Sequence, residues 1–522
     1  MLYRPLALAP ALFSTLLWTL SPAALADRIG APYRGPSELL TSQQQEEEEE
    51  EETGTEPGGD PSEGEDPGPD PFGSGTTQPG PGQPGTGRGP GGKQQQIDGS
   101  RLWQWWFEHN KDRILTRTNE RGRVHFGSAY YWFGPGAKAP PRQIDRVSPQ
   151  LRKTDIFPAL KRAVRNTKHI AVQTEACTAL GRIASVPADD KDKKDGESDN
   201  LVVRELVWVL GATPRQTPRN RELIHSAILA LGMTGDPEAG AILLRHFTSP
   251  QVALSDREAG YTAVALGLCR HREAIPDLVA ALPKTGRHKA EQDRSLGAIH
   301  ALGLYGPDAV AEMEEKGAIE KLVKLARPYR DPSIVMQAVC ALGRLQVGVK
   351  TVGKALGSKS PDVRWTAVLA LANYSREPKD AKEAVKLLLG RGGFKNSDQQ
   401  TKSFSLLACG DLAWRLDPNS GERKKLLRHL REQVQANDTY VRSCAAVGCG
   451  VAGDQESKAI LAEMLRKPAN AEYTFAALCL GLGLLRATDQ ADYVLKEFVQ
   501  ASKRDFDTRG YGALSIALMG DT

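Results

Sequence analysis

The hydrophobic pattern of this chain is dominated by a ten-residue phrase of small and apolar residues that returns about every 37 residues. The phrase reads AILALGMTGD in one copy and AVLALANYSR in another. Its ten copies begin at Ala176, Ala227, Thr262, Ala298, Ala338, Ala367, Ser405, Ala445, Ala477 and Gly512. Repetition at this period is typical of stacked helical hairpins. We therefore predict an all-α chain whose residues 155–522 form an α-solenoid of about ten helical hairpins.

The residues between the copies predict a second helix in each hairpin. Apolar residues recur there at the three- and four-residue spacing of an amphipathic helix, at 155–166, 238–247, 272–282, 379–389, 424–434 and 456–465. Ser360 before Pro361, and the similar stretch around Asp438, indicate helix starts. Gly235, followed by Asp236 and Pro237, indicates a helix end and a turn.

The phrases resemble a known repeat family. The strings DVR followed by AVLALA, and ELIHSAILALGMTGDPEAGAILLRHF, are similar to HEAT repeats, in particular to the short type found in phycobilisome-lyase-like proteins. The resemblance covers about 70% of the chain and implies a HEAT/armadillo-like solenoid. It implies no particular activity, because scaffolds, adaptors and a few enzymes share this fold.

The first 100 residues differ in composition from the repeats. Residues 1–26 have the pattern of a secretory signal peptide, with Arg4, an apolar stretch and a small-residue cleavage site near Ala26. An uncleaved membrane anchor is the alternative, although the apolar stretch is short for a span. Residues 27–100 form an acidic and then Gly/Pro-rich tail that we predict to be disordered, with low sequence complexity. The tail is interpreted as a spacer, or else as a segment that tethers or repels a charged surface.

Residues 101–154 combine aromatic and basic side chains. The string WQWWFEHNKDRIL resembles a segment that precedes HEAT arrays in some secreted bacterial proteins. Trp103, Trp106 and Phe107 are at helical spacing and predict a short amphipathic helix. We expect this segment to cap the array beside its first repeat; the alternative is an exposed surface for stacking on sugars or nucleic acid. The candidate aromatic residues are Trp103, Trp105, Trp106, Phe107, Tyr130, Tyr131 and Trp132.

Positive charge is concentrated in the same region. The formal net charge of +4 hides a balance of −12 through residue 87 and +16 in the rest of the chain. A basic face could attract an envelope polysaccharide or a nucleic acid, or it could simply be a solvated surface. The candidate basic surface consists of Arg113, Arg117, Arg121, Arg123, Lys153, Lys161, Arg162 and Arg165.

The sequence contains no recognisable catalytic motif. The seven cysteines lie in or beside the phrases, where they are expected to be small buried residues rather than a disulfide framework or a metal site. The nine histidines are scattered singly. HEAT-repeat di-iron hydroxylases carry repeated His-Glu pairs, and no His-Glu dipeptide occurs here. We therefore predict a protein that is not an enzyme and has no cofactor.

The function that fits these features best is an exported, non-catalytic scaffold that binds a protein partner through the concave surface of the solenoid. Binding of an anionic polymer near residues 101–168 is the alternative, and an enzyme of unknown type is the third. The signal peptide indicates a periplasmic or extracellular protein with no membrane span in the mature chain. The last hairpin has no visible second helix after Met519. This predicts self-association through that end, or else a reading frame that has been cut short.

Overall fold

The computed structural model describes five residues of the aromatic segment and most of the repeat region. These are Trp103, Gln104, Trp106, Phe107 and Asn110, with residues 149–520 except 185–196, 213–217, 250–253, 284–291, 328–330, 397, 469 and 502. In this part of the chain the backbone forms helices and turns, with no strand. The predicted signal peptide and acidic tail lie outside the described residues.

The first, apolar part of all ten copies of the phrase lies in helices, which we call the phrase helices. They are α8 (Ile170–Ala184), α10 (Pro218–Thr234), α12 (Asp256–Leu268), α14 (Gln292–Leu304), α17 (Pro332–Leu345), α19 (Pro361–Leu371), α21 (Gln399–Arg415), α23 (Thr439–Ala452), α25 (Glu472–Leu484) and α27 (Phe506–Met519). The helical character of the phrase, inferred from its period, is therefore confirmed at every copy.

The segments between the phrases supply the second helices. They are α6 (Pro149–Leu151), α7 (Phe157–Asn166), α9 (Glu197–Ala212), α11 (Pro237–Thr248), α13 (Ile275–Ala280), α15 (Val310–Glu315), α16 (Ala318–Leu325), α18 (Val349–Ala355), α20 (Pro378–Leu389), α22 (Gly421–Val434), α24 (Lys458–Leu465) and α26 (Ala491–Val494). Short 3-10 or π-helical turns adjoin several of them, at η2 (Arg152–Ile156), η3 (Arg272–Ala274), η5 (Pro307–Ala309), η6 (Gln455–Ser457), η7 (Thr488–Gln490) and η8 (Leu495–Val499).

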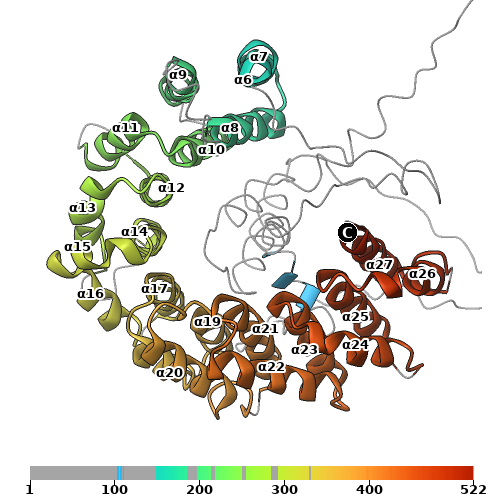
Figure 1. Ribbon diagram of the computed structural model, residues 1–522. Coiled ribbons are helices and arrows are strands. Elements are labelled where there is room, and N and C mark those ends of the chain that lie inside the picture. Colours follow the sequence, from blue (N-terminus) through green and yellow to red (C-terminus); the bar gives the residue numbers. More distant parts are fainter. Residues whose placement is uncertain are drawn as a thin grey trace, which may run out of the picture. The chain divides into compact units, whose positions relative to one another are not determined.

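The phrase helices pack in sequence order, each on the next copy from α8 through to α27. Each also packs on the helix before it in the chain, as α7 does on α8 and α22 on α23 (Figure 1). A hairpin in such an array buries its apolar faces only with its neighbours present. The described residues thus form an all-α solenoid of the HEAT/armadillo type, which confirms the predicted fold class.

The small residues of the phrase allow this close stacking. At Gly232, an added Cβ would lie 2.5 Å from the Ala265 carbonyl oxygen of the next phrase helix. At Gly267, it would lie 2.6 Å from the Cα of Ala301, one helix further along. Glycine occupies the same phrase position in five other copies, and there too an added Cβ would lie 3.0 Å or less from an atom of the following phrase helix. These are Gly181, Gly303, Gly343, Gly410 and Gly450. The repeated phrase is therefore a helix–helix contact motif.

The turns follow the sequence signals with one difference. Gly235 adopts a left-handed φ of +67°, and Asp236 caps α11 by accepting a hydrogen bond from the Glu238 amide. Asp438 caps α23 by accepting from two backbone amides, at 2.9 and 3.1 Å. Ser360 occupies the N-cap position of α19, but its hydroxyl makes no capping hydrogen bond.

A polar cluster joins α19 to α21. Asp398, the N-cap of α21, accepts hydrogen bonds from Arg364 Nη2 at 2.9 Å and from the Trp365 indole at 3.2 Å, both on α19. The Thr401 hydroxyl and the Gln400 amide donate to the same carboxylate, at 2.6 and 3.0 Å. Burial alone would raise the pKa of Asp398, but these donors outweigh it and hold the pKa below its usual value.

This cluster predicts a pH-dependent contribution to stability. A carboxyl whose pKa is lower in the folded state stabilises the fold above its unfolded pKa of about 3.9 and loses this contribution as the pH falls through the folded value. Asp398→Asn should therefore melt below the wild type at pH 7, and the difference should shrink below about pH 4. Thermal melting from pH 7 to pH 2 measures this. The exposed Asp492→Asn is the matched control and should follow the wild type; a pH-independent gap for Asp398→Asn would contradict the prediction.

Candidate binding surface at the last repeats

The described residues of the aromatic segment are helical and share one face. Trp103, Trp106, Phe107 and Asn110 follow the i, i+3, i+4, i+7 spacing, and the Asn110 side-chain amide donates to the Trp106 carbonyl oxygen at 2.8 Å. The exposed fractions of the three rings are 1%, 2% and 0% in chain order. Tryptophan is rarely buried so completely. In this arrangement the three rings therefore offer no surface for stacking on a sugar or a base.

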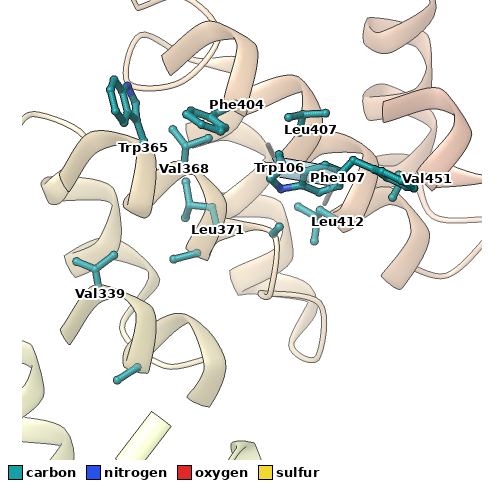
Figure 2. Close-up of a cluster of buried hydrophobic side chains, with 14 of the residues drawn as sticks. Trp106, Phe107, Val339, Trp365, Val368, Leu371, Phe404, Leu407, Leu412 and Val451 are labelled. Atoms are coloured by element: carbon teal, nitrogen blue, oxygen red, sulfur yellow. The ribbon is translucent and has the colours of Figure 1, made fainter. Parts of the chain in front are cut away.

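The segment contacts the last repeats of the solenoid. The Trp103 indole N–H donates to the main-chain oxygen of Tyr473, on α25, at 3.2 Å. The Trp103 ring lies 4.8 Å from the ring of Tyr511, on α27, and the Phe107 ring lies 6.2 Å from the same tyrosine. Trp106 and Phe107 belong to the buried hydrophobic cluster that Figure 2 shows. Trp103 thus bridges two adjacent repeats, with its buried N–H satisfied.

Tyrosines of three neighbouring phrase helices lie where the segment binds: Tyr473 on α25 and Tyr511 on α27 contact it, and Tyr440 on α23 stacks on Tyr473. We call Tyr440, Tyr473 and Tyr511 the aromatic edge. The rings of Tyr440 and Tyr473 are stacked, with centroids 5.4 Å apart and an interplanar angle of 11°. The Tyr473 hydroxyl pairs with the Thr439 hydroxyl at 2.6 Å. Burial raises the pKa of Tyr473, so this hydroxyl stays protonated at neutral pH. The three side chains are half-buried.

The helices behind the aromatic edge are buried on all sides. Every residue of α23 from Ser443 to Ala452 is buried, and so is every residue of α25 from Thr474 to Leu484. By contrast, Tyr261 and Val264 leave the face of α12 half-exposed. A helix that is apolar all round requires cover on every face. The face of the last phrase helices is therefore a covered surface, and Trp103 and Phe107 provide cover at its edge.

The position of the aromatic segment differs from our expectation. We expected it beside the first repeat, whereas the contacts of Trp103 and Phe107 are with α25 and α27, the last two phrase helices. Nearness in sequence does not fix the contact here. The 38 residues between Asn110 and Pro149 allow a reach of up to about 130 Å, and closing such a loop costs little more than closing a shorter one.

Several other candidate residues cannot be compared with the structure. Trp105, Tyr130, Tyr131 and Trp132 lie outside the described residues, as do Arg113, Arg117, Arg121 and Arg123. Sequence reasoning did not single out the tyrosines of the aromatic edge. A signal was nevertheless present, because Tyr440 and Tyr473 each occupy the second residue of a phrase helix.

Half of the described basic candidates are engaged within the protein. Arg165 on α7 holds the buried Glu205 on α9 through two hydrogen bonds, of 2.5 and 2.7 Å, and Lys161 Nζ lies 3.4 Å from the same carboxylate. The guanidinium of Arg165 also lies over the ring of Trp208, 4.2 Å from its centroid. Lys153 and Arg162 are exposed. Lys161 and Arg165 therefore belong to an ion-pair cluster with Glu205 at the first hairpin, far in sequence from the tyrosines of the aromatic edge.

The cysteine thiols are placed as packing residues rather than as reactive groups. Cys177, Cys409, Cys444, Cys449 and Cys479 are buried and unpaired, and Cys269 and Cys340 are half-buried. Burial raises the pKa of Cys177 to about 12 and that of Cys269 to about 11, so neither forms a thiolate nucleophile at neutral pH. No group of three or more His, Cys, Asp or Glu side chains among the described residues is placed to hold a metal ion.

His225 and His246 make contacts within the fold. His225 stacks on Tyr261 with ring centroids 4.4 Å apart, and burial followed by the charge of Arg257 lowers its pKa to about 4. His246 Nε2 lies 3.1 Å from a carboxylate oxygen of Glu258. Neither arrangement places a nucleophile beside a base. In the described part of the chain, no helix has both the length and the apolar character that crossing a bilayer requires.

No family profile and no curated protein matches the sequence. Solved structures do match. One is a designed armadillo repeat protein, 14% identical with a TM-score of 0.27; the match covers 47% of this chain and 99% of that one. Another is a crystal structure of a Kap121p triple mutant, 10% identical with a TM-score of 0.35, covering 78% of this chain and 44% of that one. This chain is a helical repeat protein that resembles armadillo and HEAT structures. The fold is shown by the sequential packing of the helices and does not rest on this similarity.

Proposed function

We propose that this chain is a non-catalytic scaffold that binds a segment of another protein on the face of its phrase helices. One observation carries the proposal: the last phrase helices already hold a protein helix, through the buried rings of Trp103, Trp106 and Phe107. A regular array of helices is a suitable surface for such segments because each repeat adds contact area. Export by the predicted signal peptide would place the partner in the cell envelope or outside the cell.

The test compares two matched double variants with the wild type as baits. Tyr261→Ser with Tyr440→Ser changes half-buried rings on phrase helices, whereas Lys382→Ser with Lys424→Ser changes exposed residues of α20 and α22. Each mature chain captures proteins from the envelope fraction of its own cells, after equal melting temperatures have been checked. We expect the tyrosine variant to retain at least about tenfold less of the proteins that both the wild type and the lysine variant retain. A tenfold loss corresponds to about 1.4 kcal/mol of binding free energy at the contact.

Salt separates this proposal from binding of an anionic polymer. Retention of a protein segment by apolar contacts should change little when the salt concentration is raised from about 50 to about 200 mM. Binding of an anionic polymer should fall steeply over the same range through counterion release. Equal retention by both double variants would contradict the proposed surface. Steep loss of a captured polysaccharide or nucleic acid with salt would favour the basic residues near the first hairpin, such as Lys153 and Arg162.

A further inference from the structure

The helix at Trp103 binds a distant part of its own chain in the manner of a ligand. Its hydrogen bond to the Tyr473 oxygen joins residues 370 positions apart. Its contacts with α27 include those between the rings of Trp103 and Phe107 and the ring of Tyr511. An amphipathic helix that presents anchors at i, i+3 and i+4 to a receiving surface is a common mode of peptide recognition. The interaction is therefore of a kind that a separate protein segment could also make.

The receiving surface is built by the repeats themselves. Arg504 pairs with Glu472 at 2.7 Å, and its guanidinium lies over the rings of Phe475 and Phe498, at 4.3 and 4.6 Å from their centroids. The Thr508 hydroxyl donates to the Glu472 carbonyl oxygen at 3.1 Å, which ties the start of α27 to the start of α25. These contacts hold the last two hairpins together without the segment. None of these contacts involves the segment.

We propose that the helix containing Trp103, Trp106 and Phe107 is a tethered ligand that closes a binding site at the aromatic edge. The site takes an amphipathic protein helix with aromatic residues at i, i+3 and i+4, and the chain's own segment occupies it until such a partner displaces it. The proposal deepens the proposed function, on which it rests for the partner, by naming the kind of segment that is bound and the element that regulates access.

Tethering explains how the segment competes. Covalent attachment raises the local concentration of a ligand, to about millimolar where the attachment is short, so that modest affinity keeps the site mostly occupied. A free partner then binds with an apparent affinity reduced by the fraction of chains whose site is open. The Tyr473 oxygen accepts an indole N–H, so tryptophan should be preferred at the first anchor position over phenylalanine, which has no donor.

The test uses the full mature chain and a fluorescein-labelled synthetic peptide of residues 101–112. In the open variant, Trp103→Ala with Phe107→Ala removes two anchors of the internal ligand. Fluorescence anisotropy should show that this variant binds the peptide at least about tenfold more tightly than the wild type, because the site is no longer occupied. Tyr511→Ala in the open variant should weaken its binding of the peptide at least about tenfold. A peptide with phenylalanine in place of tryptophan at the first anchor should bind about 2- to 10-fold more weakly.

Two outcomes would overturn the proposal. If the wild type binds the peptide as tightly as the open variant, the internal segment does not close the site. If neither chain binds the peptide while circular dichroism shows that the open variant has lost helix, the segment is a structural part of the array. A peptide carrying both alanine substitutions is the control for non-specific binding and should not bind either chain.

Light scattering tests whether the segment acts within one chain. We expect the wild type and the open variant to have the mass of a monomer at the concentrations of the peptide assay. A wild-type dimer that disappears in the open variant would mean that the segment docks on a second copy, which would overturn the intramolecular assignment. Because the peptide assay needs no natural partner, it distinguishes the two proposals: peptide binding by the open variant can succeed even if the envelope capture fails.

Discussion

Gly232→Ala should lower the stability of the chain, although alanine is the better helix former. The added Cβ would lie 2.5 Å from the Ala265 oxygen and 2.6 Å from the Ala265 Cα, and both atoms belong to the backbone of the next phrase helix. Backbone atoms cannot move aside as a flexible side chain can, so α10 and α12 must separate. Overpacking of this kind costs about 1–3 kcal/mol, against a gain of at most about 1 kcal/mol from helix propensity.

A matched glycine provides the control. Gly510 lies in the exposed part of phrase helix α27, and an added Cβ there would meet no atom within 4 Å. Gly510→Ala should therefore stabilise the chain by about 0.5–1 kcal/mol through the backbone entropy of the unfolded state. Thermal and urea denaturation of the two variants beside the wild type measure the opposite signs. Two variants of equal stability would mean that the phrase helices do not approach as closely as their glycines indicate.

The sequence predicted the array because one phrase carries one physical constraint in every copy. A helix that packs on its neighbour at the distance seen for Gly232 and Ala265 can accept only a small residue at each contact point, and that requirement recurs with the repeat. Periodic small and apolar residues are therefore readable without a structure. Capping aspartates such as Asp438 are readable for the same reason, since their chemistry is local.

The position of the aromatic segment could not be read in this way. Its own helical spacing is local and was predicted from Trp103, Trp106 and Phe107. Its binding site is formed by the starts of α25 and α27, more than 360 residues later in the chain. Contact between such distant segments depends on the three-dimensional arrangement of the chain. The entropic cost of bringing two segments together grows slowly with the number of residues between them, so it differs little between the first and the last repeat. Nearness in sequence was therefore a poor guide.

The covered face of the last repeats also escaped sequence reasoning. Polar residues are scarce in α25 between Phe475 and Leu484, which marks the helix as buried on all sides. The phrase in the other copies is similarly apolar, so composition alone does not distinguish a helix covered by its neighbours from one that also carries a bound segment. The distinction needs the exposure of each residue, as Tyr261 on α12 shows by remaining half-exposed.

Removal of the Arg431 guanidinium should be among the most damaging single changes to the C-terminal repeats. Arg431, on α22, donates from Nε and Nη2 to the two carboxylate oxygens of Asp454, at 2.6 and 2.7 Å, and only 3% of the Asp454 side chain is exposed. Arg431→Met keeps most of the aliphatic packing but leaves the carboxylate buried without this partner. The expected loss is about 3 kcal/mol, the lower end for a broken buried pair because a quarter of Arg431 is exposed to water.

Glu456 supplies the matched control, because it pairs with the same guanidinium from the surface. Its side chain is 77% exposed, so Glu456→Gln should cost no more than about 1 kcal/mol. The double variant Arg431→Met with Asp454→Asn should recover part of the loss, since the buried charge is then gone as well. Urea denaturation of these variants and of the single variant Asp454→Asn gives the coupling free energy between Arg431 and Asp454. If Arg431→Met and Glu456→Gln proved equally mild, the pair would be a solvated surface contact, and the turn between α23 and α24 would owe its stability to packing alone.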